Sequence, residues 1–173
     1  FESFQKIARL KRGMVVTEKI DGTNAQIYIG EDGEFLTGSR TRWITPDADN
    51  FGFSRWAHEH KDELMTLGPG RHFGEWWGSG IQRGYGLKEK IFSLFNTSRW
   101  AGDEPSCCHV VPVLYAGDFS TEKIDDLLDE LRTGGSVAVP GFMRPEGVVV
   151  YHPQSRTLFK RTLEKDDSGK GFE

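Results

Sequence analysis

The sequence contains little cysteine and no long apolar run. Its two cysteines, Cys107 and Cys108, are adjacent, and neighbouring cysteines seldom bridge each other. This argues against a disulfide framework and gives a poor zinc signal, so we expect a reducing, cytoplasmic setting. Apolar stretches stay well short of the roughly 20 residues of a membrane span, and the first residues do not form a signal peptide. We therefore expect no membrane partner.

Positive charge is not in excess either. The chain has 22 Lys and Arg against 26 Asp and Glu, which gives a formal net charge of −4. A protein that coats nucleic acid without specificity is usually basic, so any contact with nucleic acid must be local. Each local basic cluster also fits an ordinary solvated surface. The clusters are Lys6 to Arg12, Arg40 with Arg42, and Lys160 with Arg161.

The length and composition predict one globular domain. The 173 residues are 36% hydrophobic and 28% charged, which is enough for a real core. We expect a single domain over residues 1–173 and a monomer.

The pattern of apolar residues predicts an α+β fold of antiparallel sheets with peripheral helices. Turn residues at Gly30–Gly33 separate two of the expected strands. The expected strands are Met14–Lys19, Ala25–Ile29, Glu34–Leu36, Arg71–Trp77, Val110–Ala116, Gly147–Tyr151 and Thr157–Lys160.

Two helices are expected. The first covers about Phe53 to Leu67, where apolar and aromatic residues recur at helical spacing. The second begins after Ser120, a good N-cap residue, and ends at Gly134. Its stripe consists of Ile124, Leu127, Leu128 and Leu131, with Phe119 and Ile124 at the two staple positions.

The stretch TEKIDGTN places Lys19 just before an Asp-Gly pair, with apolar alternation on both sides. This pattern predicts a β-hairpin. Lys19 then has two interpretations, either a surface lysine on a hairpin or an amine aimed into a pocket as a nucleophile. The triplet Lys-x-Asp-Gly is too short to decide between them.

Four later segments carry unusual polar residues beside expected strands. GSRTRW contains Arg40, HFGEWWG contains Glu75, PEGVVVY opens with Glu146 after its proline, and LFKRT contains Lys160. A carboxylate inside an aromatic strand is costly unless it is paired or hydrogen-bonded. Glu75 therefore indicates either a structural salt bridge or a ligand contact.

In this order, Lys-x-Asp-Gly, Ser-Arg, Gly-Glu, Glu-Gly-Val-Val and a strand-ending Lys resemble the motifs of the nucleotidyltransferase superfamily of ligases and capping enzymes. The extended form EKIDGTN is similar to the RNA ligase branch, particularly the phage and RNA-editing ligases. The resemblance covers about Lys6 to Lys170. It implies an ATP-grasp-like nucleotidyltransferase core.

The resemblance also implies roles for individual residues. Lys19 would attack the α-phosphate of ATP and form a lysyl-AMP intermediate. Glu146, assisted by Asp21, would bind the divalent metal, Mg²⁺ or Mn²⁺. The implied nucleotide-binding residues are Thr17 and Glu18 beside the adenine, Asn24 and Arg40 near the ribose and phosphates, Glu75 on a ribose hydroxyl, Phe95 stacked on adenine, and Lys160.

Two positions qualify this resemblance. In KIFSLFN, Phe92 rivals Phe95 for the adenine, and Asn96 follows Phe95 where relatives often have Asp. Relatives commonly end with Lys-x-Lys, whereas here Thr162 occupies the second position. Arg161 or Lys165 could take over that charge.

The chemistry explains these residue types. A free lysine has a pKa near ~10.4, and only the neutral amine attacks. Burial, neighbouring cations such as Lys160 and a bound metal all disfavour the ammonium. Mg²⁺ offsets the charge that builds on phosphate oxygens.

The expected function is an ATP-dependent RNA ligase that seals an RNA 5′-phosphate to a 3′-hydroxyl, for RNA repair. Only thirteen residues follow Lys160, so we expect no OB-fold or other C-terminal domain. The motif style suggests a phage protein acting in the host cytoplasm. The alternatives are a DNA ligase, a GTP-using capping-type transferase, and a nucleotide- or RNA-binding module without catalysis.

Overall fold

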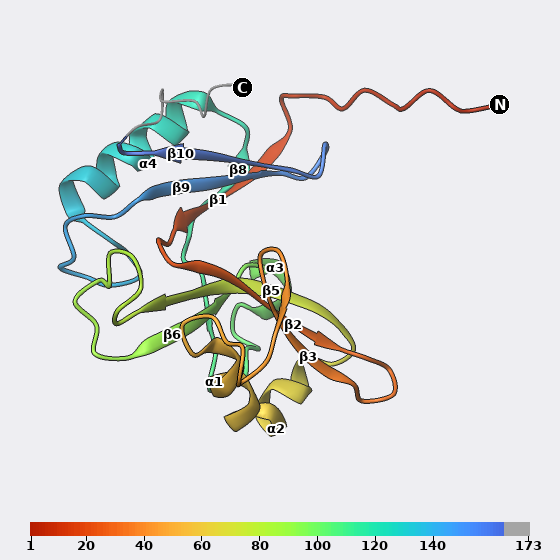
Figure 1. The fold of residues 1–173 in the computed structure, drawn as a ribbon. Coiled ribbons are helices and arrows are strands. Elements are labelled where there is room, and N and C mark those ends of the chain that lie inside the picture. The colour runs from red at the N-terminus through yellow and green to blue at the C-terminus, as the bar shows by residue number, and fades with distance from the viewer. Residues whose placement is uncertain (165–173) are drawn as a thin grey trace, which may run out of the picture. The chain divides into compact units, whose positions relative to one another are not determined.

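The computed structural model describes residues 1–164 (Figure 1). Its backbone contacts divide the chain into two compact units. The first unit contains the residues up to Lys19 and those from Pro112 onward, and the second unit contains Ile20–Val111. The expectation of a single domain over residues 1–173 stays a prediction.

The first unit is a four-stranded antiparallel sheet with one long helix. The strands lie in the order β10-β9-β1-β8. Alternate residues of β1 and β9, such as Val16 and Val150, face helix α4 and form a buried cluster with its leucines. The elements are β1 (Gly13–Lys19), β8 (Val113–Asp118), α4 (Thr121–Gly134), β9 (Gly147–His152) and β10 (Thr157–Thr162).

The second unit is a six-stranded sheet in the order β4-β3-β2-β5-β6-β7, antiparallel except for the pair β6–β7. Its core lies on one face, where Ile27, Trp76 and Phe92 pack with residues of the covering helices, Phe53 among them. The strands are β2 (Thr23–Ile29), β3 (Phe35–Ser39), β4 (Trp43–Ile44), β5 (Gly70–Gly78), β6 (Lys90–Leu94) and β7 (His109–Val110). The helices are α1 (Phe53–Glu59), α2 (Lys61–Leu64), the 3₁₀ turn η1 (Met65–Leu67) and α3 (Thr97–Trp100).

This mixture of helices and mainly antiparallel sheets confirms the predicted α+β class. The turn at Gly30–Gly33 is also confirmed, since the Gly30 N–H donates to the Glu34 carbonyl (2.8 Å) and joins β2 to β3. Within the described residues, no helix is both long enough and apolar enough to cross a membrane. The two cysteines are free thiols, as expected.

The predicted hairpin at Asp21–Gly22 is wrong. β1 and β2 belong to different sheets and do not pair with each other. Neither Asp21 nor Gly22 has the positive φ that the tight hairpin turn requires. The Gly22 N–H instead donates to the Glu75 carboxylate (3.1 Å), so this segment connects two sheets.

The strand expected over Val110–Ala116 is also wrong as one element. It is divided into β7 and β8 around Val111–Pro112. Proline lacks the N–H that a continuing ladder needs, and the chain passes here from the six-stranded to the four-stranded sheet.

The two helices lie where they were expected, with two differences. The first is interrupted at His60, whose backbone (φ −105°, ψ 18°) leaves the helical region. The second begins at the predicted cap, since the Ser120 hydroxyl accepts from the Lys123 N–H (3.1 Å). It ends at Gly134 as predicted, and the difference is that Gly135, with φ 82°, is the glycine that caps its end. The sequence pattern missed the short elements β4, β6 and α3.

Candidate functional site

Lys19 is positioned by the register of the four-stranded sheet. It ends β1 and lies opposite Gly147, the first residue of β9, so it meets the residue just before that strand. Its Nζ donates to Glu146 Oε2 at 2.6 Å. The two side chains are 25% and 19% exposed. The pair is half-buried but still accessible to a ligand.

Two further predicted residues lie on the same face of this sheet as Lys19. Thr17 lies across from Val149, and Val149 lies across from Lys160. Cross-strand neighbours point to the same face, as do residues two apart in one strand. Thr17, Lys19 and Lys160 therefore share the face opposite α4.

The position of the missing second lysine is visible in this register. Thr162 lies across from Gly147, which itself lies across from Lys19. A lysine at this position would add a second strand-end cation in the row of Lys19. Arg161 points to the other face and forms an ion pair with Asp125 of α4 (3.2 Å). Lys165 lies outside the described residues.

Glu18 lies on the α4 side of the sheet and is 1% exposed. Its Oε2 accepts from the backbone N–H groups of Val137 (2.8 Å) and Ala138 (2.9 Å). Its Oε1 has no hydrogen-bond partner among the described residues. The side chain thus anchors the segment after α4. The expected contact between Glu18 and adenine stays a prediction, and the backbone of Glu18 would have to make that contact.

Glu75 belongs to the second unit and is only 7% exposed. Its Oε1 accepts from the Gly22 N–H (3.1 Å), and its Oε2 accepts from Asn24 Nδ2 (3.0 Å). Register explains the second contact, because Asn24 lies directly across from Glu75 on β2. These hydrogen bonds offset the cost of a carboxylate among aromatic residues.

Asp21 is held within the second unit by two residues that the motif search did not include. Its Oδ2 accepts from Arg83 Nε (2.9 Å), and its N–H donates to Tyr85 Oη (2.9 Å). Both partners come from the glycine-rich stretch GSGIQRGYG, where Tyr85 has a φ of 52°. The density of glycines in this stretch was the available sign of an unusual backbone, but it does not identify Arg83 or Tyr85 as a partner of Asp21.

The two expected metal ligands are not brought together within one unit. Glu146 belongs to the first unit and Asp21 to the second, and each forms an ion pair with a cation, Lys19 and Arg83 respectively. Across residues 1–164, no three His, Cys, Asp or Glu side chains form a group that could hold a metal.

Phe92 and Phe95 have different environments. Phe92 is fully buried in the core, where it contacts Phe53 and Trp56, whereas Phe95 is 41% exposed. Phe95 follows β6, and its backbone N–H donates to the Phe73 carbonyl of β5. Phe95 thereby lies on the same sheet face as Glu75. Asn96 caps α3 by accepting from the Arg99 N–H, a role that an aspartate could fill equally well.

Arg40 is exposed just after β3. Its neighbour Arg42 donates to the carbonyls of Ala48 (3.1 Å) and Asp49 (3.4 Å). Arg42 therefore orders its own loop, although both arginines are exposed.

Among the described residues, the pKa is shifted at His72, Cys107 and Cys108, which lie outside the predicted set. Burial lowers the pKa of His72, and the nearby Arg99 guanidinium lowers it further against an opposing hydrogen bond to the Gly68 carbonyl. Burial raises the pKa of both thiols, Cys107 and Cys108. These cysteines are accordingly poor nucleophiles.

Comparison with known proteins identifies the family. The family model for RNA ligase matches residues 12–165, so this chain belongs to the RNA ligase family. No curated protein matches the chain.

Several solved structures share the fold. A mutant of the Naegleria gruberi RNA ligase with ATP and manganese is 20% identical, with a TM-score of 0.67 over 91% of this chain and 52% of that one. Another mutant of that ligase, with AMP and manganese, is 22% identical, with a TM-score of 0.64 over 87% of this chain and 49% of that one. The chain thus spans about half the length of the ligases it matches.

Proposed function

We propose that this protein is an ATP-dependent RNA ligase that works through a lysyl-AMP intermediate on Lys19. The observation that carries the proposal is the strand-end amine of Lys19, half-buried and 2.6 Å from Glu146. Thr17 and Lys160 share its sheet face, in a chain of the RNA ligase family.

In the first step, the neutral Lys19 Nζ attacks the α-phosphorus of ATP. A P–N bond forms, the bond from the α-phosphorus to the bridging oxygen breaks, and pyrophosphate leaves with the electron pair. The amine first loses a proton, and the Glu146 carboxylate is the acceptor within hydrogen-bond distance. Lys160 places positive charge on the same face, which favours both the neutral amine and a bound phosphate.

The second unit supplies side chains suited to the nucleoside. The Glu75 carboxylate, which accepts from Gly22 and Asn24, is a hydrogen-bond acceptor suited to a ribose hydroxyl. The exposed ring of Phe95 offers a stacking surface for adenine. Arg40 is free to approach ribose or phosphate oxygens.

A divalent cation fits this chemistry with few protein ligands. Glu146 is the carboxylate next to Lys19, with Asp21 assisting, and phosphate oxygens and water complete the usual coordination of Mg²⁺ or Mn²⁺. When bound, the ion supplies positive charge that stabilises the developing phosphate charge.

Two further transfers complete the sealing of RNA. An oxygen of the RNA 5′-phosphate attacks the α-phosphorus, the P–N bond breaks, and Lys19 is regenerated. The 3′-hydroxyl then loses its proton and attacks the 5′-phosphate, which forms the new phosphodiester and releases AMP. The partners are therefore ATP and RNA with 5′-phosphate and 3′-hydroxyl ends.

One observation favours a second candidate, a nucleotide- or RNA-binding module without catalysis. Thr162 stands in the row of Lys19 where relatives carry a second lysine, and Arg161 is engaged with Asp125. Covalent labelling of the protein with ATP separates the ligase from the module without catalysis.

The test is covalent labelling. The protein is incubated with α-labelled ATP and Mg²⁺ or Mn²⁺, denatured, and separated on a gel, with GTP in a parallel reaction. We expect label from ATP on wild type and on Lys61→Ala, a matched lysine of α2, and none on Lys19→Ala. Label that persists on Lys19→Ala, or its absence from the wild type, would overturn the proposal, and preferential use of GTP would indicate a capping-type enzyme.

A further inference from the structure

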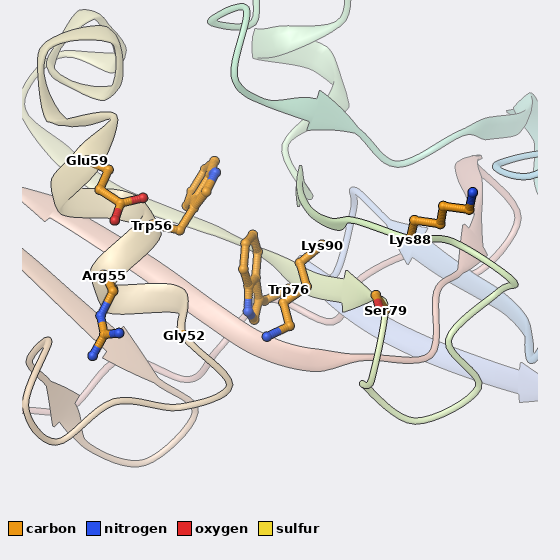
Figure 2. A pocket seen from close by; sticks show the side chains of 8 residues that line it. All are labelled: Gly52, Arg55, Trp56, Glu59, Trp76, Ser79, Lys88 and Lys90. Carbon is orange, nitrogen blue, oxygen red and sulfur yellow. The ribbon is translucent and has the colours of Figure 1, made fainter.

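A cavity of about 440 Å³ lies within the second unit, between helix α1 and the ends of strands β5 and β6. Figure 2 shows its lining, which includes three cationic side chains, Arg55, Lys88 and Lys90. Glu59 is the carboxylate among the lining residues, so the cavity carries an excess of positive charge. We refer to it as the basic trough.

The three cations are available to a ligand. Within residues 1–164, none of them forms an ion pair. Lys90 Nζ donates to the Phe51 carbonyl (2.9 Å), and the Arg55 guanidinium makes a long contact with the Pro46 carbonyl (3.5 Å). Neutral carbonyls leave the positive charges uncompensated, and this is the electrostatic pattern of an anion site.

The cations are spread along the trough and do not converge on one point. In Figure 2, Arg55 and Lys88 lie at opposite sides of the view, with Trp76 and Lys90 between them. A single phosphate would be held best by groups that converge on it. A line of separated cations fits a chain of phosphates, such as the backbone of a nucleic acid strand.

The indole ring of Trp56 forms part of the wall of the basic trough. Trp56 is half-buried, and its ring is fixed by stacking on His60 (5.0 Å between centroids) and on Phe53 (5.8 Å). Because these rings cover the indole faces, a ligand meets the edge of Trp56, and an unpaired base can pack edge-to-face on it while the backbone follows the positive charge.

The trough is joined to the segment that follows the proposed nucleophile. The Phe51 carbonyl accepts from both Lys90 Nζ and Trp76 Nε1 (3.1 Å), and the adjacent Asn50 donates to Thr23 Oγ1 (3.1 Å). Thr23 opens β2, four residues after Lys19 in the sequence. A strand held in the trough is thus connected to the start of β2 through direct contacts of the second unit.

We propose that the basic trough binds an unpaired segment of the RNA substrate, with its phosphates on Lys90, Lys88 and Arg55 and one base against Trp56. The proposal rests on the proposed function for the identity of the substrate. It adds a site outside the adenylation motifs and a preference for unpaired nucleotides.

The test measures binding without chemistry. A fluorescent single-stranded RNA of about twelve nucleotides with a 5′-hydroxyl, which cannot be adenylylated, is titrated by anisotropy without ATP at several salt concentrations. We expect Lys88→Gln to weaken binding several-fold and to reduce the slope of log K against log salt by about 0.7, the change for one phosphate contact on a single strand. The matched control is Lys61→Gln, an exposed lysine of α2 outside the trough, which should bind as wild type does.

Two further arms test the occupant. Trp56→Leu should weaken binding by about two- to tenfold, as expected for the loss of one edge-to-face aromatic contact. Blunt duplex RNA of the same length should bind less tightly than the single strand. Equal effects of Lys88→Gln and Lys61→Gln, tighter binding of the duplex, or displacement of the RNA by equimolar pyrophosphate would each overturn the trough as a strand site. Failure of Lys19 labelling leaves these results unaffected, so the proposed function and this inference fail separately.

Discussion

Phe92 and Phe95 are three residues apart, but their environments in the structure differ. Phe92 is fully buried in the core, so Phe92→Ala should destabilise the fold by about 3–5 kcal/mol. Phe95 is 41% exposed, and Phe95→Ala should leave stability nearly unchanged while weakening ATP binding by about 1–3 kcal/mol. Urea unfolding and ATP titration of both variants check this. Normal ATP binding by Phe95→Ala would remove it from the nucleotide site.

His72 gives a pH-dependent contribution to stability. Burial lowers its pKa below the ordinary 6.5, so the folded protein binds this proton less readily than the unfolded chain does. Its contribution is therefore complete above pH 6.5 and is lost as the pH falls below 6.5 toward the lowered value. Unfolding by urea at about pH 7.5 and about pH 5.5 should show a smaller loss for His72→Gln than for wild type. The exposed His109→Gln is the control and should behave as wild type, and an identical loss in all three proteins would contradict the assignment.

At the residue scale, the motifs predicted Thr17, Glu146 and Lys160 as site residues, and the sheet register shows where they lie relative to Lys19. Thr17 and Lys160 lie on its sheet face, and Glu146 is the direct partner of Lys19. Arg83 and Tyr85 were not predicted because they act on Asp21 from about sixty residues away, and a contact of that kind leaves no periodic signal. The motif placed Glu18 beside the adenine, whereas strand alternation places its side chain on the face opposite Lys19.

At the element scale, Gly22 is needed for close packing and not for a turn. A Cβ on Gly22 would lie 2.5 Å from the Trp76 carbonyl oxygen and 2.6 Å from the Trp77 Cβ. Gly22→Ala should therefore push against β5, the strand that carries Glu75, and cost about 1–3 kcal/mol by overpacking. Gly13→Ala is the matched control, because its nearest neighbour would be at an ordinary 3.5 Å.

Both glycine variants are compared by urea unfolding and by labelling of Lys19 with ATP. The expected result is lower stability and slower labelling for Gly22→Ala alone. Wild-type values for Gly22→Ala would mean that β5 yields freely, and the close packing would then have no role in positioning Glu75.

The misread hairpin shows where prediction of the elements stops. The existence of strands β1 and β2, the Ser120 cap and the leucine stripe of α4 are local features. Periodicity and capping predict them well. Sheet membership is different, because Val16 packs against α4 while Ile27 packs in the six-stranded unit. Both strands alternate in the same way, so the sequence pattern does not say which core each strand covers. Asp-Gly between them then looks like a turn.

At the scale of the whole molecule, the net charge of −4 limits how RNA is held. An acidic chain binds a polyanion only through local clusters, and we expect these to be the basic trough, Lys160 and Arg40. Few phosphates are neutralised, so binding should be modest and should weaken as salt rises. Attachment of AMP to Lys19 involves a nucleotide alone and should tolerate salt better.

The comparison of these two steps is the last prediction. Lys19 labelling and strand sealing are measured from about 20 to about 300 mM NaCl, where the slope of sealing reports the released counterions. The substrate is a nick with RNA on the 3′-hydroxyl side, and an all-DNA nick serves as the control. We expect sealing to fall several-fold more steeply than labelling. Parallel salt curves would contradict binding through local cations, and equal sealing of the all-DNA nick would place the enzyme among DNA ligases in its substrate choice.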